Sequence, residues 1–274
     1  MPSRVVLITG AAGGLGSVMT AALLKDGHAV AAVDRSAEGL TRLVTSLGTG
    51  RERLLSIEAE LSEPAACARA VDTAVAHFGR LEGVVNNAGI GMSAIRPDAE
   101  TNHPGIAELT AEVWDRFFAI NVRAPLMVTQ AALPHLKRAE WGRIVTNTTS
   151  YRTMLRVLPY GATKSALESM SAVWALELDG TNVTSNVLVP GGPTDTPFIN
   201  DASGWPRDQM LRPSIMGPPI CWLMSEASNG VNGKRFTAQH WDAALSPDEA
   251  AKIAGRDIGW PELAAGPAWF TTKA

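Results

Sequence analysis

The chain has 274 residues, of which 46% are hydrophobic and 19% charged, and its formal net charge at pH 7 is −3. This composition is typical of a soluble globular protein, and the interspersed acids and bases, without a basic block, argue against nucleic acid and an anionic membrane as partners. Because Cys67 and Cys221 belong to no metal-spaced cluster, no apolar stretch has the length of a bilayer and no targeting segment is apparent, we expect no metal, no membrane span and a cytoplasmic location.

Short apolar runs of β character alternate with longer stretches of helical period. The predicted strands cover residues 5–8, 29–33, 54–58, 83–85, 144–146, 183–189 and 234–237. The predicted helices cover residues 17–25, 37–47, 64–77, 113–136 (as one helix or two), 159–178 and 218–225. Continuous apolar strands are typical of a parallel sheet buried on both faces. The order predicts a single α/β domain over residues 1–274, built on a Rossmann-type doubly wound parallel sheet with helices on both faces.

Three stretches interrupt this alternation. Residues 91–108 are polar, and residues 194–219 are rich in proline. Long irregular segments within a compact domain usually form lids or binding loops, so residues 194–219 are predicted to be the substrate loop. Residues 255–274 contain Trp260 and Trp269 among prolines and glycines and are predicted to form an irregular tail.

The first predicted strand runs into the glycine-rich segment TGAAGGLG, residues 9–16, and a helix follows. Glycines allow the chain to turn sharply and to bring backbone N–H groups to a pyrophosphate at a helix N-terminus. A glycine-rich turn alone is a weak signal, but a position between a buried strand and a helix is the context that a dinucleotide-binding loop requires.

The second predicted strand is followed by Asp34, 18 residues after Gly16. This is close to the offset of roughly 20 residues at which an acid binds the ribose hydroxyls of a dinucleotide. A carboxylate there would repel a 2′-phosphate, so the sequence favours NAD over NADP. The neighbouring Arg35 would suit that phosphate and keeps NADP open, and a helix cap is the structural alternative for Asp34.

Tyr160 and Lys164 are four residues apart in a predicted helix, which places a phenol and an ammonium group one turn apart on the same face. The phenol of a tyrosine has a pKa of about 10, which is too high for a base at neutral pH, but a nearby cation lowers this pKa. Such a tyrosine could exchange a proton with an alcohol or carbonyl oxygen. Without other signals, most pairs of this spacing lie on a protein surface.

In combination and in this order, these features resemble the short-chain dehydrogenase/reductase family, in its short rather than its extended form. The resemblance runs from Thr9 to about Thr237. The residues that carry it are Gly10, Gly14, Gly16, Asp34, Asn86, Asn87, Ala88, Gly89, Asn121, Tyr160, Lys164, Pro190 and Gly191.

The resemblance implies an oxidoreductase that transfers a hydride between NAD(H) and a secondary alcohol or ketone. Tyr160 would be the general acid/base, Lys164 would bind the nicotinamide ribose and lower the pKa of Tyr160, and Asn121 would hold a water molecule of the proton path. The cofactor would lie against Gly10, Gly14, Leu15, Gly16, Asp34, Asn87, Ala88, Gly89, Tyr160, Lys164, Pro190, Thr194 and Thr196.

Three positions depart from the family pattern. The family has a serine after the fifth strand, where this chain has Thr149 followed by Ser150. The register from the strand favours Thr149 as the hydroxyl that binds the substrate oxygen, with Ser150 as the alternative. Glu60 stands where an aspartate near the adenine is usual. The threonine at the nicotinamide carboxamide would be Thr196, or Thr194, because an additional glycine shifts the spacing.

Two other functions stay open. Nucleotide-sugar epimerases and dehydratases share the fold and the Tyr/Lys pair, but they are longer and space the glycines differently. A non-catalytic dinucleotide sensor would not need Tyr160, Lys164 and Asn121 together.

The substrate and the assembly follow less directly from the sequence. Residues 91–108, 151–158 and 194–219 would flank the catalytic end of the sheet and select a small-molecule alcohol or ketone. Their aromatic and methionine side chains suit a carbon ring or chain, and their arginines suit a carboxylate or phosphate. Apolar faces on residues 113–136 and 159–178, together with the family resemblance, predict a homodimer or homotetramer built on these helices.

Overall fold

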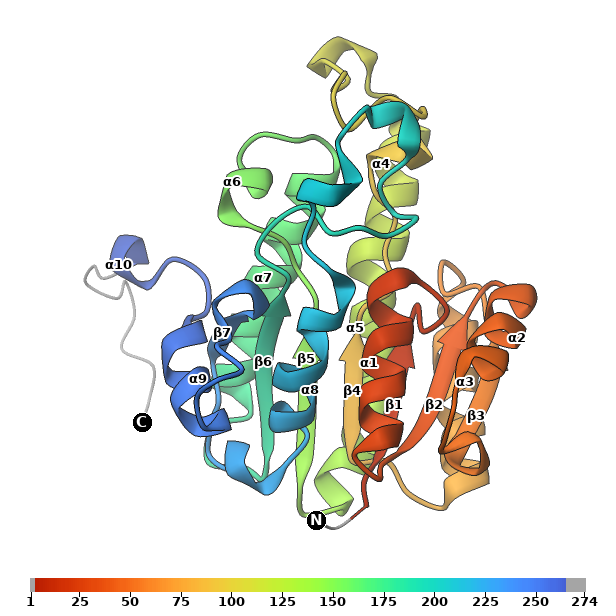
Figure 1. The fold of residues 1–274 in the computed structure, drawn as a ribbon, viewed down its shortest axis with the longest axis vertical. Helices are drawn as coiled ribbons and strands as arrows, with labels where there is room; N and C mark the ends of the chain where they lie inside the picture. Colours follow the sequence, from red (N-terminus) through yellow and green to blue (C-terminus); the bar gives the residue numbers. More distant parts are fainter. Residues whose placement is uncertain (1–2, 265–274) are drawn as a thin grey trace.

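The computed structural model describes residues 3–264 and has a central sheet with helices on both faces (Figure 1). The strands are β1 (Val5–Thr9), β2 (Ala29–Asp34), β3 (Leu54–Glu58), β4 (Gly83–Asn86), β5 (Gly142–Thr146), β6 (Val183–Val189), β7 (Lys234–Thr237) and β8 (Gly255–Asp257). They lie in the order β3-β2-β1-β4-β5-β6-β7-β8. All neighbouring pairs are parallel except β7 and β8. The predicted doubly wound parallel sheet is confirmed, with one antiparallel strand added at its edge.

Two layers of helices cover the sheet. The helices are α1 (Gly14–Lys25), α2 (Ala37–Ser46), α3 (Pro64–Phe78), α4 (Ala111–Phe118), α5 (Ala124–Arg138), α6 (Tyr151–Met154), α7 (Tyr160–Glu177), α8 (Gly217–Leu223), α9 (Pro247–Ala254) and α10 (Pro261–Ala264). The core on one face contains residues of α1, α2, α8 and α9, and the core on the other contains residues of α3, α5 and α7. None of these helices, all within residues 3–264, is long and apolar enough to cross a membrane.

Strand β1 shows why the sheet has this form. Val6 and Ile8 belong to the core beneath α1 and α8, and Val5 and Leu7 belong to the core beneath α3 and α5. Alternate side chains of a strand point to opposite faces, so a strand buried on both faces is apolar throughout.

The strand order reverses at β1, whose neighbours are β2 on one side and β4 on the other. Crossovers therefore leave in opposite directions there, and a crevice opens beyond the carboxyl ends of the strands. In Figure 1 these carboxyl ends point upward, and α4, α6 and the segment before α8 rise above them.

The stretch predicted as one or two helices over residues 113–136 corresponds to α4 and α5, which extend beyond it at both ends and are joined by a π-helical turn at Ala119–Arg123. A π turn adds a residue to the helical repeat, and such turns often occur at functional sites. Asn121 lies within this turn and is completely buried.

Residues 255–264, which the sequence assigned to an irregular tail, contain β8 and α10, and residues 265–274 lie outside the described part of the chain. Strand β8 is only three residues long, with the sequence Gly-Arg-Asp. These residues have little β propensity, so the strand forms because β7 offers an unpaired edge and not because of its own pattern. The predicted substrate loop also ends earlier than expected, because α8 begins at Gly217.

Candidate active site

A cavity of about 870 Å³ opens beyond the carboxyl ends of β1, β4, β5 and β6. It contains every residue for which the sequence predicted contact with the cofactor, together with both candidate hydroxyl residues. The predicted residues that line it are Gly10, Gly14, Leu15, Gly16, Asp34, Asn87, Ala88, Gly89, Thr149, Ser150, Tyr160, Lys164, Pro190, Thr194 and Thr196. The fold thus gathers one site from segments far apart in the sequence.

The glycine-rich loop allows neighbouring loops to approach closely. Gly10 has a positive φ of 63°, and a Cβ there would lie 2.8 Å from Cα of Ala88. A Cβ on Gly14 would lie 2.3 Å from Cγ2 of Thr196, so the loops after β1 and β6 meet at this point. The N-cap of α1, Gly13, makes no side-chain capping bond. The first N–H groups of α1 border the cavity without a side-chain cap, which suits a pyrophosphate.

Asp34 ends β2 and ties two backbone segments together. Its Oδ2 accepts a hydrogen bond from the N–H of Ala12 at 3.0 Å, and its Oδ1 accepts one from the N–H of Ser36 at 3.0 Å. Ser36 caps α2, so the carboxylate connects the glycine-rich loop with the start of that helix. Asp34 can therefore both hold the backbone at the start of α2 and bind ribose hydroxyls, because its carboxylate also borders a cavity.

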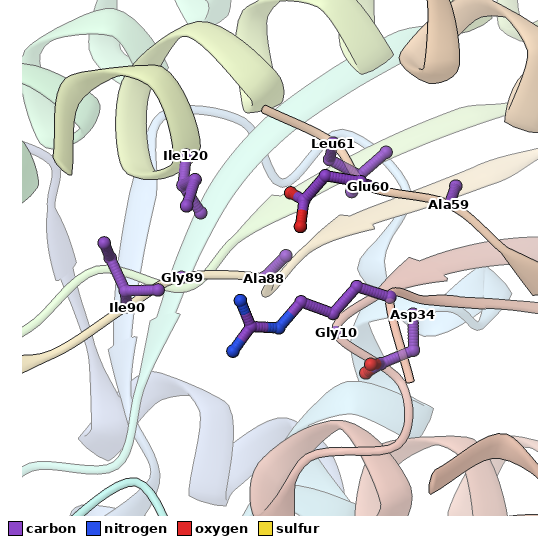
Figure 2. A pocket seen from close by; sticks show the side chains of 10 residues that line it. Gly10, Asp34, Ala59, Glu60, Leu61, Ala88, Gly89, Ile90 and Ile120 are labelled. Atoms are coloured by element: carbon purple, nitrogen blue, oxygen red, sulfur yellow. The ribbon is translucent and has the colours of Figure 1, made fainter. Parts of the chain in front are cut away.

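A smaller cavity of about 110 Å³ continues from the main one beside Asp34. Figure 2 shows the carboxylates of Asp34 and Glu60 entering it from the ends of β2 and β3, with Ile90 and Ile120 opposite. Arg35 also lines it. An apolar slot bordered by acids and one guanidinium fits the adenosine part of a dinucleotide, so the residues present fit the cofactor that the sequence implied.

Tyr160 is the first residue of α7, and its phenol borders the main cavity. Burial raises the pKa of Tyr160 to about 12, and a hydrogen bond with the side chain of Thr149 partly opposes this rise. At neutral pH the phenol therefore carries its proton. This is the state in which it can donate a proton to a carbonyl oxygen.

Lys164 follows one turn later on α7 and is buried. Its Nζ donates a hydrogen bond to the main-chain oxygen of Asn147 at 2.8 Å and lies 5.8 Å from the ring centroid of Tyr160. Burial lowers the pKa of Lys164 to about 8. Burial disfavours both the phenolate and the ammonium ion, and the effect that opposes it at Tyr160 comes from Thr149. The expected lowering of the Tyr160 pKa by Lys164 stays a prediction.

The two candidate hydroxyl residues have different partners. The side chain of Thr149 is close enough to the phenol of Tyr160 to lower the pKa of that phenol. Ser150 instead caps α6, because its Oγ accepts a hydrogen bond from the N–H of Thr153 at 3.1 Å and lies 2.9 Å from the hydroxyl of the same residue. This geometry supports Thr149 over Ser150 as the substrate-binding hydroxyl.

Asn121 does not line the cavity, but it hydrogen-bonds to residues that stabilise the cavity wall. Its Oδ1 accepts a hydrogen bond from the N–H of Ile90 at 2.8 Å, and its Nδ2 donates to the oxygen of Ile90 and to Oγ1 of Thr163, each at 3.0 Å. A Cβ on Gly89 would lie 3.1 Å from Oδ1 of Asn121 and 3.6 Å from Nζ of Lys164. The glycine thus permits these groups to approach one another, while the predicted water-holding role of Asn121 stays a prediction.

Three segments cover the end of the cavity beyond Tyr160. The phenol ring of Tyr160 lies 5.8 Å from the ring of Phe198 between centroids, at an interplanar angle of 57°. Phe198 also rests on Gly91, where a Cβ would lie 2.5 Å from the Phe198 ring. Residues of 91–108, 151–158 and 194–216 line this end, and their role as substrate loops stays a prediction.

Sequence reasoning missed a buried polar network beneath the site. Arg235 on β7 forms an ion pair with Glu168 on α7, and both contact Thr148. Arg235 follows the exposed Lys234 in β7, so nothing in the strand pattern separates the buried arginine from a surface one. Asn147 was also missed, although its Nδ2 donates to Oδ1 of Asn87 at 3.0 Å and joins the loops after β4 and β5.

Comparisons with known proteins agree with this geometry. The family model of short chain dehydrogenase matches residues 4–206. A short-chain type dehydrogenase/reductase of Picea abies is 28% identical over 84% of this chain and 89% of its own length. D-threitol dehydrogenase of Mycolicibacterium smegmatis is 31% identical over 85% of this chain and 90% of its own length.

Solved structures with the same fold contain either form of the cofactor. The 3-ketoacyl-(acyl-carrier-protein) reductase of Brucella melitensis, complexed with NADH, superposes with a TM-score of 0.70 at 27% identity, over 84% of this chain and 93% of that chain. A short chain dehydrogenase of Burkholderia cenocepacia in complex with NADP superposes with a TM-score of 0.71 at 30% identity, over 86% of this chain and 95% of that chain.

Proposed function

Because the chain belongs to the short-chain dehydrogenase family, we propose that it is an oxidoreductase that transfers a hydride between NAD(H) and a secondary alcohol or ketone of a small molecule. One observation carries the proposal. The phenol of Tyr160 and the side chain of Thr149 line the same wall of the cavity that also contains the glycine-rich loop, close enough for Thr149 to oppose the rise of the Tyr160 pKa. A proton donor therefore adjoins a dinucleotide site, as hydride transfer to a ketone requires.

In the reducing direction, each residue has a defined task. A nicotinamide cofactor, held by the glycine-rich loop and Asp34, would supply the hydride. Tyr160 donates its phenolic proton to the substrate oxygen, and Thr149 donates a hydrogen bond to the same oxygen. Lys164, as an ammonium ion, stabilises the negative charge that Tyr160 gains when its proton leaves. In the oxidising direction the same groups act in reverse, with Tyr160 as the base.

The acid at the end of β2 supports NAD as the cofactor. The Asp34 carboxylate borders the cavity at the ribose end, where a 2′-phosphate would meet its negative charge. Arg35 borders the same cavity and would partly offset that charge. Because relatives with this fold are known with NADH and with NADP, the preference is proposed from Asp34 alone.

Two arginines at the substrate end indicate what the substrate carries. Arg96, Arg207 and Arg212 are each neutralised by a carboxylate of their own loop. Arg152 and Arg156 line the cavity, and their side chains make no hydrogen bond or ion pair with any group in residues 3–264. An unpaired guanidinium group at a substrate cavity is suited to a carboxylate or phosphate. The proposed substrate is therefore a ketone or alcohol that bears an anionic group.

A homo-oligomer remains the proposed assembly. Trp114 on α4, Leu126 on α5, and Val173 and Leu176 on α7 are exposed large apolar side chains on the helices for which the sequence predicted an interface. Light scattering at micromolar concentration tests this point, and the mass of a monomer would contradict it.

The deciding experiment is an assay of the oxidation of NADH and of NADPH in the presence of a panel of small ketones, some neutral and some acidic. Turnover of at least one ketone that depends on Tyr160 supports the proposal. Tight binding of the dinucleotide without turnover of any alcohol or ketone would favour the sensor alternative.

A further inference from the structure

Arg235 lies beneath the proposed site, on β7, and is only 5% exposed. Its Nη1 donates a hydrogen bond to Oε2 of Glu168 at 2.6 Å and another to Oγ1 of Thr148 at 3.0 Å. Its Nη2 donates to the main-chain oxygen of Thr149 at 2.5 Å. One guanidinium group therefore joins α7 to the segment that follows β5.

Glu168 is completely buried, and both of its oxygens have partners. Besides Arg235, Oε2 accepts a hydrogen bond from the hydroxyl of Thr148 at 2.7 Å. Oε1 accepts a hydrogen bond from the N–H of Gly259 at 3.3 Å, and it lies 3.3 Å from the hydroxyl of Tyr151, which donates to the main-chain oxygen of Gly259 at 2.7 Å. The carboxylate is thus fixed from several sides, and it fixes the guanidinium of Arg235 in turn.

Stability alone is a weak explanation for this pair. Burying two charges removes both from water, and the attraction between them commonly does no more than offset that loss. A well-packed pair of apolar side chains would hold the sheet and α7 together at least as well. The more informative feature is Nη2, the second arm of the guanidinium group, because this nitrogen binds Thr149 and not Glu168.

Thr149 depends on that arm for its position. Strand β5 ends at Thr146, so Thr149 lies beyond the last rung of the ladder with β6. Within residues 3–264, the main-chain oxygen of Thr149 accepts a single hydrogen bond, and the donor is Arg235. Losing it would free the peptide group of Thr149 to rotate, and its hydroxyl would leave the phenol of Tyr160.

We propose that Arg235 is a positioning residue that holds Thr149 so that its hydroxyl meets the substrate oxygen beside Tyr160, with Glu168 holding Arg235 in place. The inference rests on the proposed function, because it assigns Arg235 a part in the same reaction. Arg235 touches neither substrate nor cofactor and acts through Thr149.

A double-mutant cycle on the ketone reductase activity tests this assignment. The enzymes are the parent, Arg235→Lys, Thr149→Val and the double variant. The lysine can keep the ion pair with Glu168, but its single nitrogen lacks the second arm that reaches Thr149. We expect Arg235→Lys to lower kcat by about tenfold or more and to leave KM for NADH within about twofold, because the binding of the dinucleotide involves other loops.

In the Thr149→Val background, the same change should cost less than about twofold, because a residue that acts through Thr149 has nothing left to position. Losses that multiply independently would overturn the proposal, as would an Arg235→Lys enzyme with the kcat of the parent. A Thr149→Val enzyme of full activity would instead remove Thr149 from the proposed function, so the two failures are distinguishable.

Arg143→Lys is the matched control. Arg143 is also a buried arginine in a strand, and it is only 2% exposed. It lies near the amino end of β5, away from the cavity, and it binds Ser228 and Asn229. Its replacement should lower the melting temperature without lowering kcat.

If Arg235→Lys does not fold, the paired variant Arg235→Met with Glu168→Met removes both charges and leaves none unpaired. This variant should fold and show the same loss of kcat, and full activity in a folded paired variant would overturn the assignment.

Discussion

Thr149 and Tyr160 belong to different elements, yet their side chains border the same cavity wall, where Thr149 opposes the rise of the Tyr160 pKa. Thr149 follows β5, and Tyr160 begins α7. This arrangement places two hydroxyl groups where a single substrate oxygen could meet both. The testable consequences begin with this pair.

Replacing Tyr160 by phenylalanine should abolish most ketone reduction and leave NADH binding unchanged. The change removes the proton donor but keeps the ring that packs near Phe198. General acid/base groups typically contribute about 10²–10⁴-fold to turnover. Steady-state kinetics measure the ketone reduction, and fluorescence titration measures the binding of NADH. Turnover within about twofold of the parent would contradict the proposed mechanism.

Thr149→Val and Ser150→Ala should differ strongly. Valine keeps the shape of threonine but removes the hydrogen bond to the substrate oxygen, and losing such a donor costs about 10²–10³-fold in turnover. Ser150→Ala removes the cap of α6, which should cost about 1 kcal/mol of stability and little activity. The reverse pattern, in which Ser150→Ala loses most of its turnover, would assign the hydroxyl that binds the substrate oxygen to Ser150.

Ketone reduction should fall as the pH rises through about 8, the value to which burial lowers the pKa of Lys164. Below that pH the ammonium ion supports the loss of the phenolic proton, and above it the positive charge is gone. The pKa of Tyr160, raised to about 12, keeps the phenol protonated throughout this range, so Tyr160 does not cause the fall.

The dependence of kcat on pH, measured for the parent and for Lys164→Arg, tests the assignment. Arginine keeps its charge across the range, so any activity that the variant retains should not show the fall. A parent enzyme with a flat profile between about pH 7 and about pH 9 would contradict the role of Lys164.

Asp34→Ala should weaken NADH binding and reduce the preference for NADH over NADPH. The change removes a charge that would repel the 2′-phosphate, and it also frees the N–H groups of Ala12 and Ser36. The ratio of kcat/KM for the two cofactors measures the preference. Arg35→Ala is the control and should shift the ratio in the opposite direction, and a parent enzyme that already prefers NADPH would reject the role given to Asp34.

Replacing Arg152 and Arg156 together by methionine should raise KM for keto acids and leave KM for their methyl esters unchanged. Loss of charge-assisted hydrogen bonds of this kind costs about 1.5–3 kcal/mol, or roughly 10- to 100-fold in kcat/KM. Arg212→Met is the matched control, because Arg212 is already paired with Asp195. Equal effects on acids and esters would show that the substrate needs no anionic group.

The sheet could be predicted because each strand has a local signature. Leu54–Glu58, Val183–Val189 and Lys234–Thr237 occur with the predicted bounds, and the other parallel strands extend by one or two residues. The central strands β1 and β2 are apolar along almost their whole length, and this signature does not depend on distant residues.

The residues that sequence reasoning missed depend on distant partners. Glu168 and Arg235 are 67 residues apart, and neither has a sequence neighbour that indicates the other. The choice between Thr149 and Ser150 was open because it depends on where α6 begins, and a helix start at a single serine is not visible in the pattern. The pKa of Tyr160 likewise depends on how deeply the folded chain covers it.

The last described strand also affects how the protein meets other copies of itself. Without β8, strand β7 would present a row of unpaired N–H and C=O groups at the rim of the sheet, which is a template for aggregation. β8 covers that row with three residues, two of them charged. The same segment continues to Gly259, whose backbone holds Glu168 and Tyr151. A chain cut after Ala254 should therefore lose solubility and turnover together, so that shielding of the rim and competence of the site depend on one short stretch of chain.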